Sequence, residues 1–358
     1  MSSDNRRMPT LPLPVSQILA GVSRSFGLSI RLLPAGVRES VALAYLLARL
    51  TDTVADTTDV AAAQRMALLD SLRHAFNRPT DHPQLAHTLR DFARHVRDPH
   101  ERALLAQGQA CLEALQQRPA ADQTVIREVL EAITQGQCWD LQTLDGPQCG
   151  VQTSAELDRY TWLVAGSVGE FWTRICALHL THWHGGDTAQ LMQWGASYGK
   201  GLQRLNILRD AGHDLRAGRC YFPAQELEPL GLDSAQLCTA ARQGDRAVLQ
   251  QLQPLLERWQ SVTEAQLHEG LRYGLSLRGR RLRLASALPC LIGIRTLSLL
   301  RQSGVQALVG HVKLRRREVQ GLLLRLLLGG VSDRQLLAQW AAGKTPPPKP
   351  AVSARIGT

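Results

Sequence analysis

Apolar residues recur at intervals of three and four along almost the whole chain, and the strict alternation of a half-buried β-strand is scarce. This spacing places apolar side chains on one face of an α-helix. We therefore predict an all-α fold. Breaks between helices are expected where proline, glycine and short polar residues gather. These places are Pro34, 77–82, 145–152, 185–186, 219–223, Gly231 and 304–310.

None of these breaks resembles a domain linker, so a single domain over residues 19–342 is expected. The chain has 358 residues, enough to bury one large core. Residues 1–18 are predicted to be a flexible N-terminus. Residues 343–358 are rich in proline and polar side chains and are predicted to be a disordered tail.

A first helix with two distinct faces is predicted from Val41 to Asp56. Its polar face spans an arc of about 60° and carries Tyr45, Arg49, Asp52 and Asp56. The opposite face is apolar and consists of Leu43, Leu46, Leu47, Leu50 and Val54.

A second helix repeats this arrangement near residue 210. Gln203, Asn206, Asp210 and Asp214 share one face. The apolar residues Leu208, Ala211 and Leu215 point away from it, and Arg209, Arg216 and Arg219 stand close to the acids.

Each of these helices places two carboxylates four residues apart, which suits a hard cation such as Mg²⁺. Either pair alone could be solvated surface. Two pairs with matching polar stripes favour metal binding, because aspartate is a poor residue for a helix interior. Arginines beside the acids suit a ligand whose phosphate oxygens are shared between metal and guanidinium. The two pairs together predict a site for a metal-bound diphosphate.

A third helix is predicted from about Leu157 to Leu180, with Tyr160 near its start. Small residues follow between Val164 and Gly169, Gly166 among them. They allow close approach of either a neighbouring helix or a ligand, and both alternatives stay open.

The net charge of +10 suits an anionic partner. Nucleic acid is the least supported, because only five Phe and five Tyr residues could stack on bases. Seven cysteines without a CxxC pair indicate reduced core residues in a cytoplasmic protein. The Leu-rich stretch from Val319 to Val331 is too short to span a bilayer. A buried helix is the favoured interpretation of this stretch, and peripheral contact at the inner membrane face is the alternative. No obligate protein partner is indicated.

Several blocks of the sequence resemble those of the squalene and phytoene synthase family. The blocks are Ser23-Arg24-Ser25-Phe26, Tyr45 to Asp56, Tyr160 with Val164 to Gly169, Gln203 to Asp214, and Arg219 to Pro223. The resemblance implies an all-α isoprenoid synthase fold with a central apolar cavity, whose mouth carries the two aspartate motifs and Mg²⁺. It is strongest to bacterial squalene synthases, which join two farnesyl diphosphates and reduce the product with NADPH.

The resemblance also implies roles for individual residues. Arg49, Arg209 and Arg219 would offset charge on the leaving diphosphate, and Tyr160 would take part in proton transfer. Lys313 and Arg315 would lie near NADPH phosphates and the substrate diphosphate. Leu288, Cys290, Leu291 and the face from Val164 to Val168 would form the dry cavity wall.

Three alternatives remain at the level of sequence. One is a synthase of the same family that makes phytoene, dehydrosqualene or presqualene diphosphate without NADPH. Another is an all-α Mg²⁺-dependent phosphohydrolase, and the last is a non-catalytic helical interaction protein.

Overall fold

Helices account for almost all regular structure in the computed structural model, which describes residues 13–22, 30, 33–78, 83–144, 150–310 and 312–344. Over these residues the only strand-like feature is an isolated bridge between His184 and Leu277. The all-α prediction is confirmed.

The first half of the chain contains α1 (Leu13–Val22), α3 (Ala35–Asp56), α4 (Ala62–Asn77), α5 (Pro83–Phe92), η1 (Ala93–His95), α6 (Pro99–Ala106), α7 (Gly108–Gln116), α8 (Ala120–Leu144), α9 (Ser154–Thr161), η2 (Trp162–Gly166) and α10 (Ser167–His179). The second half contains α11 (Thr188–Arg216), α12 (Ala224–Leu227), η3 (Glu228–Leu230), α13 (Ser234–Gln243), α14 (Arg246–Gln250), α15 (Gln253–Ser276), α16 (Arg280–Ser303), α17 (Gln306–Val309), α18 (Arg316–Leu328) and α19 (Asp333–Lys344).

Helix α3 has the two faces that its sequence predicts. It begins directly after Pro34, whose fixed φ and missing N–H suit a helix start. All five residues of the predicted apolar face are fully buried. They pack into a core that α3 shares with α4, α7 and α8. This burial leaves the stripe with Arg49, Asp52 and Asp56 facing the opposite way.

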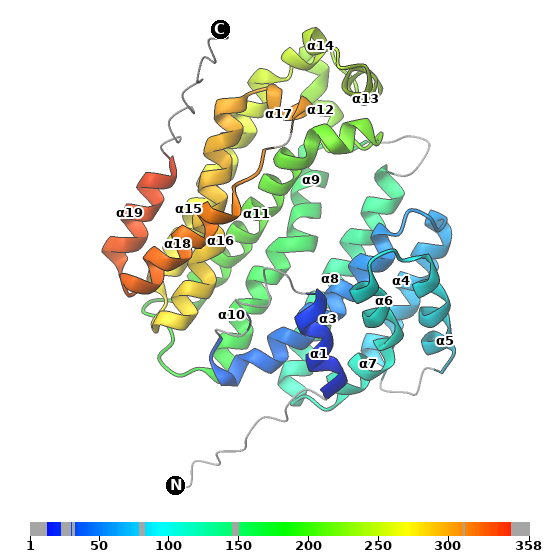
Figure 1. Cartoon of the computed structure of the whole chain (residues 1–358), viewed down its shortest axis with the longest axis vertical. Coiled ribbons are helices and arrows are strands. Elements are labelled where there is room, and N and C mark those ends of the chain that lie inside the picture. Colours follow the sequence, from blue (N-terminus) through cyan, green and yellow to red (C-terminus); the bar gives the residue numbers. More distant parts are fainter. Residues whose placement is uncertain are drawn as a thin grey trace, which may run out of the picture.

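A second core is built on three long helices that lie side by side, α11, α15 and α16 (Figure 1). Leu208, Ala211 and Leu215 of α11 are buried there, as predicted. Helices α9 and α10 connect the two halves, and α10 packs against α11 on one side and against α8 on the other. Between the two cores lies the cavity described below.

The chain is helical throughout the predicted segment as far as His179, and the π-helical turn η2 lies within it between α9 and α10. At this turn and the start of α10, the backbone lies directly against α11. A Cβ added to Gly169 would lie 1.9 Å from the Gly195 carbonyl oxygen, and one added to Gly199 would lie 2.1 Å from that of Ala165. The small residues therefore serve tight helix packing, while Val164 and Val168 reach the cavity wall.

The ends of the domain differ from the predicted boundaries. Helix α1 begins at Leu13, inside the region predicted to be a flexible N-terminus. Helix α19 continues to Lys344, whose ammonium lies 2.6 Å from Glu264, so residues 343 and 344 are not part of a disordered tail. Residues 1–12 and 345–358 lie outside the described part. Helix α16 is long and apolar enough to cross a bilayer, but 61% of its most apolar stretch is buried, as in a core helix.

Candidate active site

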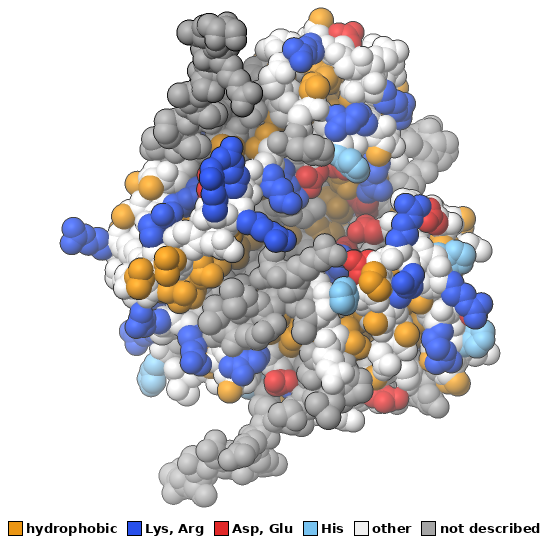
Figure 2. Space-filling model, in the orientation of Figure 1, with side chains coloured by type: hydrophobic (Ala, Val, Ile, Leu, Met, Phe, Trp, Pro, Cys, Tyr) orange, Lys and Arg blue, Asp and Glu red, His pale blue; other side chains and the backbone are white. Residues whose placement is uncertain are grey.

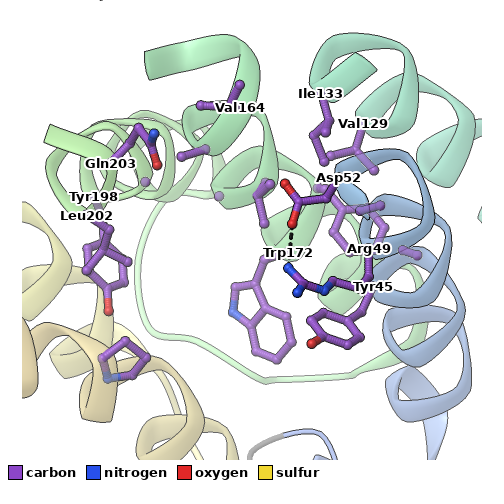
Figure 3. A pocket seen from close by; sticks show the side chains of 18 of the residues that line it. Tyr45, Arg49, Asp52, Val129, Ile133, Val164, Trp172, Tyr198, Leu202 and Gln203 are labelled. Atoms are coloured by element: carbon purple, nitrogen blue, oxygen red, sulfur yellow. Dashed lines mark hydrogen bonds and ion pairs between the residues drawn. The ribbon is translucent and has the colours of Figure 1, made fainter. Parts of the chain in front are cut away.

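An apolar cavity of about 610 Å³ opens between the two cores. Its walls come from α3, α8, η2, α10, α11 and α16. Figure 3 shows Tyr45, Arg49 and Asp52 on one side and Tyr198, Leu202 and Gln203 on the other. The same region appears in Figure 2 as a hollow with apolar side chains inside and charged side chains at its rim. The volume is within the usual range for small-molecule sites, about 300–1,000 Å³.

Arg49 and Asp52 form an ion pair on the α3 side of this cavity. Nη1 of Arg49 lies 2.5 Å from Asp52, and its Nη2 pairs with Glu101 of α6. Nε of Arg49 is buried and has no hydrogen-bond partner among the described residues. A buried donor without a partner is costly unless a ligand satisfies it. The guanidinium is therefore suited to donate a hydrogen bond to a further anionic group.

Enclosure by protein raises the pKa of Asp52 above its ordinary value, against the opposing effect of Arg49. Although 41% of the Asp52 side chain is accessible, that surface lines the cavity rather than open solvent. Enclosure and the negative charges of Asp52 and Asp140 raise the pKa of Asp56 to about 7. Asp56 ends α3 and is partly open to solvent, which limits the size of this shift but not its direction. A cation would relieve this crowding of carboxylates.

A hydrogen-bonded group from α8, α9 and the segment after α11 forms another part of the wall. Tyr221 donates to Asp140 at 2.6 Å, and Arg219 pairs with Asp140 and donates to the Tyr221 hydroxyl at 3.1 Å. The Tyr160 ring stacks between Trp139 and Tyr221, at centroid distances of 4.9 and 5.7 Å. Burial raises the pKa of Tyr160 well above its ordinary value, so its phenol is neutral.

The second carboxylate pair lies further along α11 than the cavity wall. Gln203 lines the cavity, whereas Asn206, Arg209, Asp210 and Asp214 do not. Asp210 is about 10 Å beyond Gln203 along the helix axis. This pair therefore stands outside the apolar cavity rather than within it.

Arginines neutralise the second pair much as Arg49 neutralises Asp52. Arg209 binds both carboxylate oxygens of Asp210, at 2.9 and 2.6 Å. Burial raises the pKa of Asp214, and Arg219 acts in the opposite direction. The positive charge of Arg219 also limits the rise in the pKa of Asp56. Its guanidinium is thus close enough to influence a carboxylate of each pair.

The carboxylate oxygens of the two aspartate pairs fit Mg²⁺ only when a ligand adds further oxygen atoms. Among the described residues, no three acidic, histidine or cysteine side chains converge on one point. Each aspartate pair can offer carboxylate oxygens, and diphosphate oxygens and water would complete the shell, as Mg²⁺ generally requires. Gln137 Oε1 and Ser286 Oγ in the cavity wall also have no described hydrogen-bond partner, which is consistent with a ligand site.

Some predicted site residues lie elsewhere. Leu288 is half-buried against the second core, and Cys290 and Leu291 are fully buried in it. The prediction that these three line the cavity is wrong, because α16 turns Ala285, Ser286 and Pro289 toward it instead. Leu288 lies about 100° around the helix from Pro289.

Gly166 is buried against α11 and does not line the cavity. Ser23, Arg24, Ser25 and Phe26 lie outside the described residues.

Lys313 and Arg315 are exposed just before α18. The preceding α17 packs against α11 at Gly212, where a Cβ would lie 1.9 Å from the Leu308 carbonyl oxygen. Arg216 also donates to that oxygen, at 3.0 Å. Gly212 is on the face of the helix opposite to Asp210 and Asp214. The basic pair therefore follows a segment that is anchored to α11 on the face turned away from the second carboxylate pair.

Sequence reasoning missed Asp140, Tyr221, Gln137, Trp172 and Tyr198, all of which line the cavity. Asp140 follows Trp139 near the end of a helix that carries three other acids, so its sequence does not mark it out. Tyr221 is inside the recognised block from Arg219 to Pro223. The other three carry no distinctive sequence pattern.

Comparisons with known proteins identify the family and support the fold. A family model described as squalene/phytoene synthase matches residues 19–318. The squalene synthase of Saccharomyces cerevisiae is 30% identical over 209 residues, which cover 58% of this chain and 45% of that protein. The presqualene diphosphate synthase of Zymomonas mobilis is 29% identical over 211 residues, 59% of this chain and 60% of that protein. The matched region thus spans about half the length of these relatives.

Solved structures share the fold. Ligand-bound TcSQS aligns with a TM-score of 0.72 at 23% identity, covering 92% of this chain and 89% of that one. A dehydrosqualene synthase aligns with a TM-score of 0.56 at 20% identity, covering 88% and 96% of the two chains. Because the family model covers most of the sequence, the chain belongs to the squalene/phytoene synthase family.

Proposed function

We propose that the protein joins two farnesyl diphosphates head to head to form presqualene diphosphate, and reduces this product to squalene with NADPH. The observation that carries the proposal is the apolar cavity whose one wall holds Asp52, Arg49 and the Tyr160 group. An apolar chamber beside acids and arginines suits a substrate with a hydrocarbon chain and a diphosphate. The related squalene and presqualene diphosphate synthases support the same chemistry.

The first step is ionisation of one diphosphate ester. Asp52, Asp56, Asp210 and Asp214 would hold Mg²⁺, which when bound supplies positive charge to the leaving diphosphate. Arg49 and Arg209 now neutralise the leading aspartate of each pair. When the aspartates bind metal, these guanidinium groups become available to phosphate oxygens. The C–O bond then breaks with its electron pair on the diphosphate, leaving an allylic cation.

The second step is carbon–carbon bond formation with loss of one proton. The double bond of the second substrate attacks the cation, and the proton leaves as the cyclopropane closes. Tyr160 is neutral, so it can accept this proton only by passing its own onward. Its neighbour Tyr221 donates to Asp140, which gives a route from the cavity to a carboxylate. We assign Tyr160, Tyr221 and Asp140 to this relay.

The remaining wall excludes water, which would otherwise trap the cations as alcohols. Val129, Ile133, Val164, Val168 and Leu202 supply apolar surface there. In the reductive step NADPH, when bound, supplies a hydride. Lys313 and Arg315, two exposed cations just before α18, would hold its phosphates.

The decisive experiment supplies purified protein with farnesyl diphosphate and Mg²⁺, with and without NADPH, and identifies the products. We expect squalene with NADPH and presqualene diphosphate without it. The same hydrocarbon under both conditions would favour a phytoene- or dehydrosqualene-type synthase. Release of farnesol alone would favour a phosphohydrolase.

A further inference from the structure

Helix α18 buries only one of its faces. Leu322 and Leu326 are fully buried, but Leu324, Leu327 and Leu328 are 57%, 46% and 79% exposed. The exposed leucines are spaced by three and four residues, so they form one apolar face. The buried helix predicted over 319–331 is therefore buried along one stripe, and the core leaves its other face uncovered. Figure 2 shows apolar side chains gathered over α18, with Lys and Arg side chains beside them.

The surroundings of these leucines are strongly basic. Arg316, Arg317 and Arg325 belong to the same helix, and none has an acidic partner within ion-pair distance in the described part of the chain. Arg280, at the start of α16, donates to the Leu327 carbonyl oxygen at 3.1 Å and adds a further cation. The acid of α18, Glu318, accepts a hydrogen bond from the Arg315 backbone at the helix start.

The leucine end of α18 also lies near the apolar part of the cavity. Arg280 connects that end to the start of α16. Ala285, which lines the cavity, is five residues further along α16. This separation is about 7 Å along the helix axis. The end of α18 and the cavity wall are thus both in contact with the first two turns of α16.

We propose that the outer face of α18, with the arginines around it, docks on an anionic lipid surface. Leucines flanked by arginines combine insertion into the acyl region with attraction to negative headgroups. A second copy of the chain fits less well, because a two-fold contact would oppose two positive faces. The terminal segments also lack the matching negative charge. Residues 345–358 contain Lys349 and Arg355 but no acid, and Asp4 in residues 1–12 is outnumbered by Arg6 and Arg7. Nucleic acid binding would make poor use of exposed leucines.

The test measures pelleting of the full chain with vesicles of phosphatidylcholine alone or mixed with phosphatidylglycerol. We expect binding to the mixed vesicles only. Changing Arg317→Gln and Arg325→Gln together should weaken this binding about 30-fold, since each cation near such a surface contributes about fivefold. Changing Leu324→Ser and Leu328→Ser together should weaken it about tenfold or more.

A matched control changes an exposed arginine and an exposed leucine elsewhere. Arg246→Gln on α14 with Leu178→Ser on α10, where Leu178 is 45% exposed, should bind vesicles as the unchanged chain does. Condensation of farnesyl diphosphate in detergent should be equal in all variants. This comparison separates the docking proposal from the proposed function, on which docking does not depend.

Several results would overturn the proposal. One is equal binding of the unchanged chain to both kinds of vesicle. Another is a control variant that loses as much vesicle binding as the α18 variants. A third is a dimer that forms as the concentration rises and that the α18 changes abolish. Stronger binding to polynucleotide with the same residue dependence would assign the face to nucleic acid. Should an α18 variant fail to fold, amide hydrogen exchange of the unchanged chain decides: mixed vesicles must protect residues 324–328, and a lack of protection refutes docking.

Discussion

The carboxylates at the cavity mouth should make the ligand-free protein less stable as pH rises. The pKa of Asp56 is raised from 3.8 to about 7 by enclosure and by the charges of Asp52 and Asp140. Between these pH values the folded chain keeps the proton and the unfolded chain releases it. The free energy of unfolding therefore falls as pH rises through this window and levels off above about pH 7.

The size of this effect follows from the pKa and the exposure of Asp56. For a fully enclosed carboxyl group, a rise in pKa of this size changes the free energy of unfolding by about 4 kcal/mol. Because Asp56 is partly exposed, we reduce this to about 1–2 kcal/mol. A chain of 358 residues unfolds with an entropy near 0.75 kcal/mol/K, so the expected change in Tm is about 1–3 °C.

The assay compares the Tm of the unchanged chain with that of Asp56→Asn from about pH 4.5 to pH 7.5. The difference between the two Tm values at each pH cancels the contribution of most other titrating groups. The variant should gain about 1–3 °C on the unchanged chain as pH rises. At about pH 7.5, Mg²⁺ with pyrophosphate should remove most of the Tm gain of the variant, because the cation relieves the repulsion between the carboxylates. A difference that stays constant, or changes in the opposite direction, would refute the reasoning.

The other predictions concern turnover. Asp52→Asn or Asp210→Asn should lower condensation by orders of magnitude with unchanged circular dichroism, because each removes the charge of a metal ligand and no core contact; near-normal rates in both would end the assignment of two metal-binding pairs. Tyr160→Phe should lower the rate of the first condensation, measured by single turnover, more than it weakens substrate binding, and unchanged product formation would leave this residue a packing role alone. Lys313→Ala with Arg315→Ala should spare condensation and reduce squalene formation, so that presqualene diphosphate accumulates; equal squalene yield would remove the pair from the NADPH site.

The parts of the site that lie on single helices could be predicted from sequence. The stripe of α3 with Arg49, Asp52 and Asp56 follows from helix geometry, because its apolar opposite face fixes the rotation of the helix. The stripe of α11 follows in the same way, with Leu208 and Leu215 buried. In both helices, sequence decides which side chains are neighbours, and tertiary packing does not change that.

Contacts between helices could not be predicted in this way. Asp140, Tyr160 and Tyr221 come from three segments and meet only because α8, α9 and the loop after α11 converge. The π-helical turn η2 also depends on tertiary structure, since its backbone is placed against Gly199 of α11.

The Leu-rich helix α18 shows why apolar composition alone does not predict burial. Its sequence suits a buried helix, yet burial also requires a partner on each side. The core supplies one for Leu322, Leu326 and part of Leu323. Leu328, the last residue of α18, has 79% of its surface exposed. Exposed leucines of this number lower solubility in water unless another surface covers them. Because no part of the core covers these leucines, they remain exposed to water. The same lack of a protein partner leads to the proposal that an anionic lipid surface covers this face.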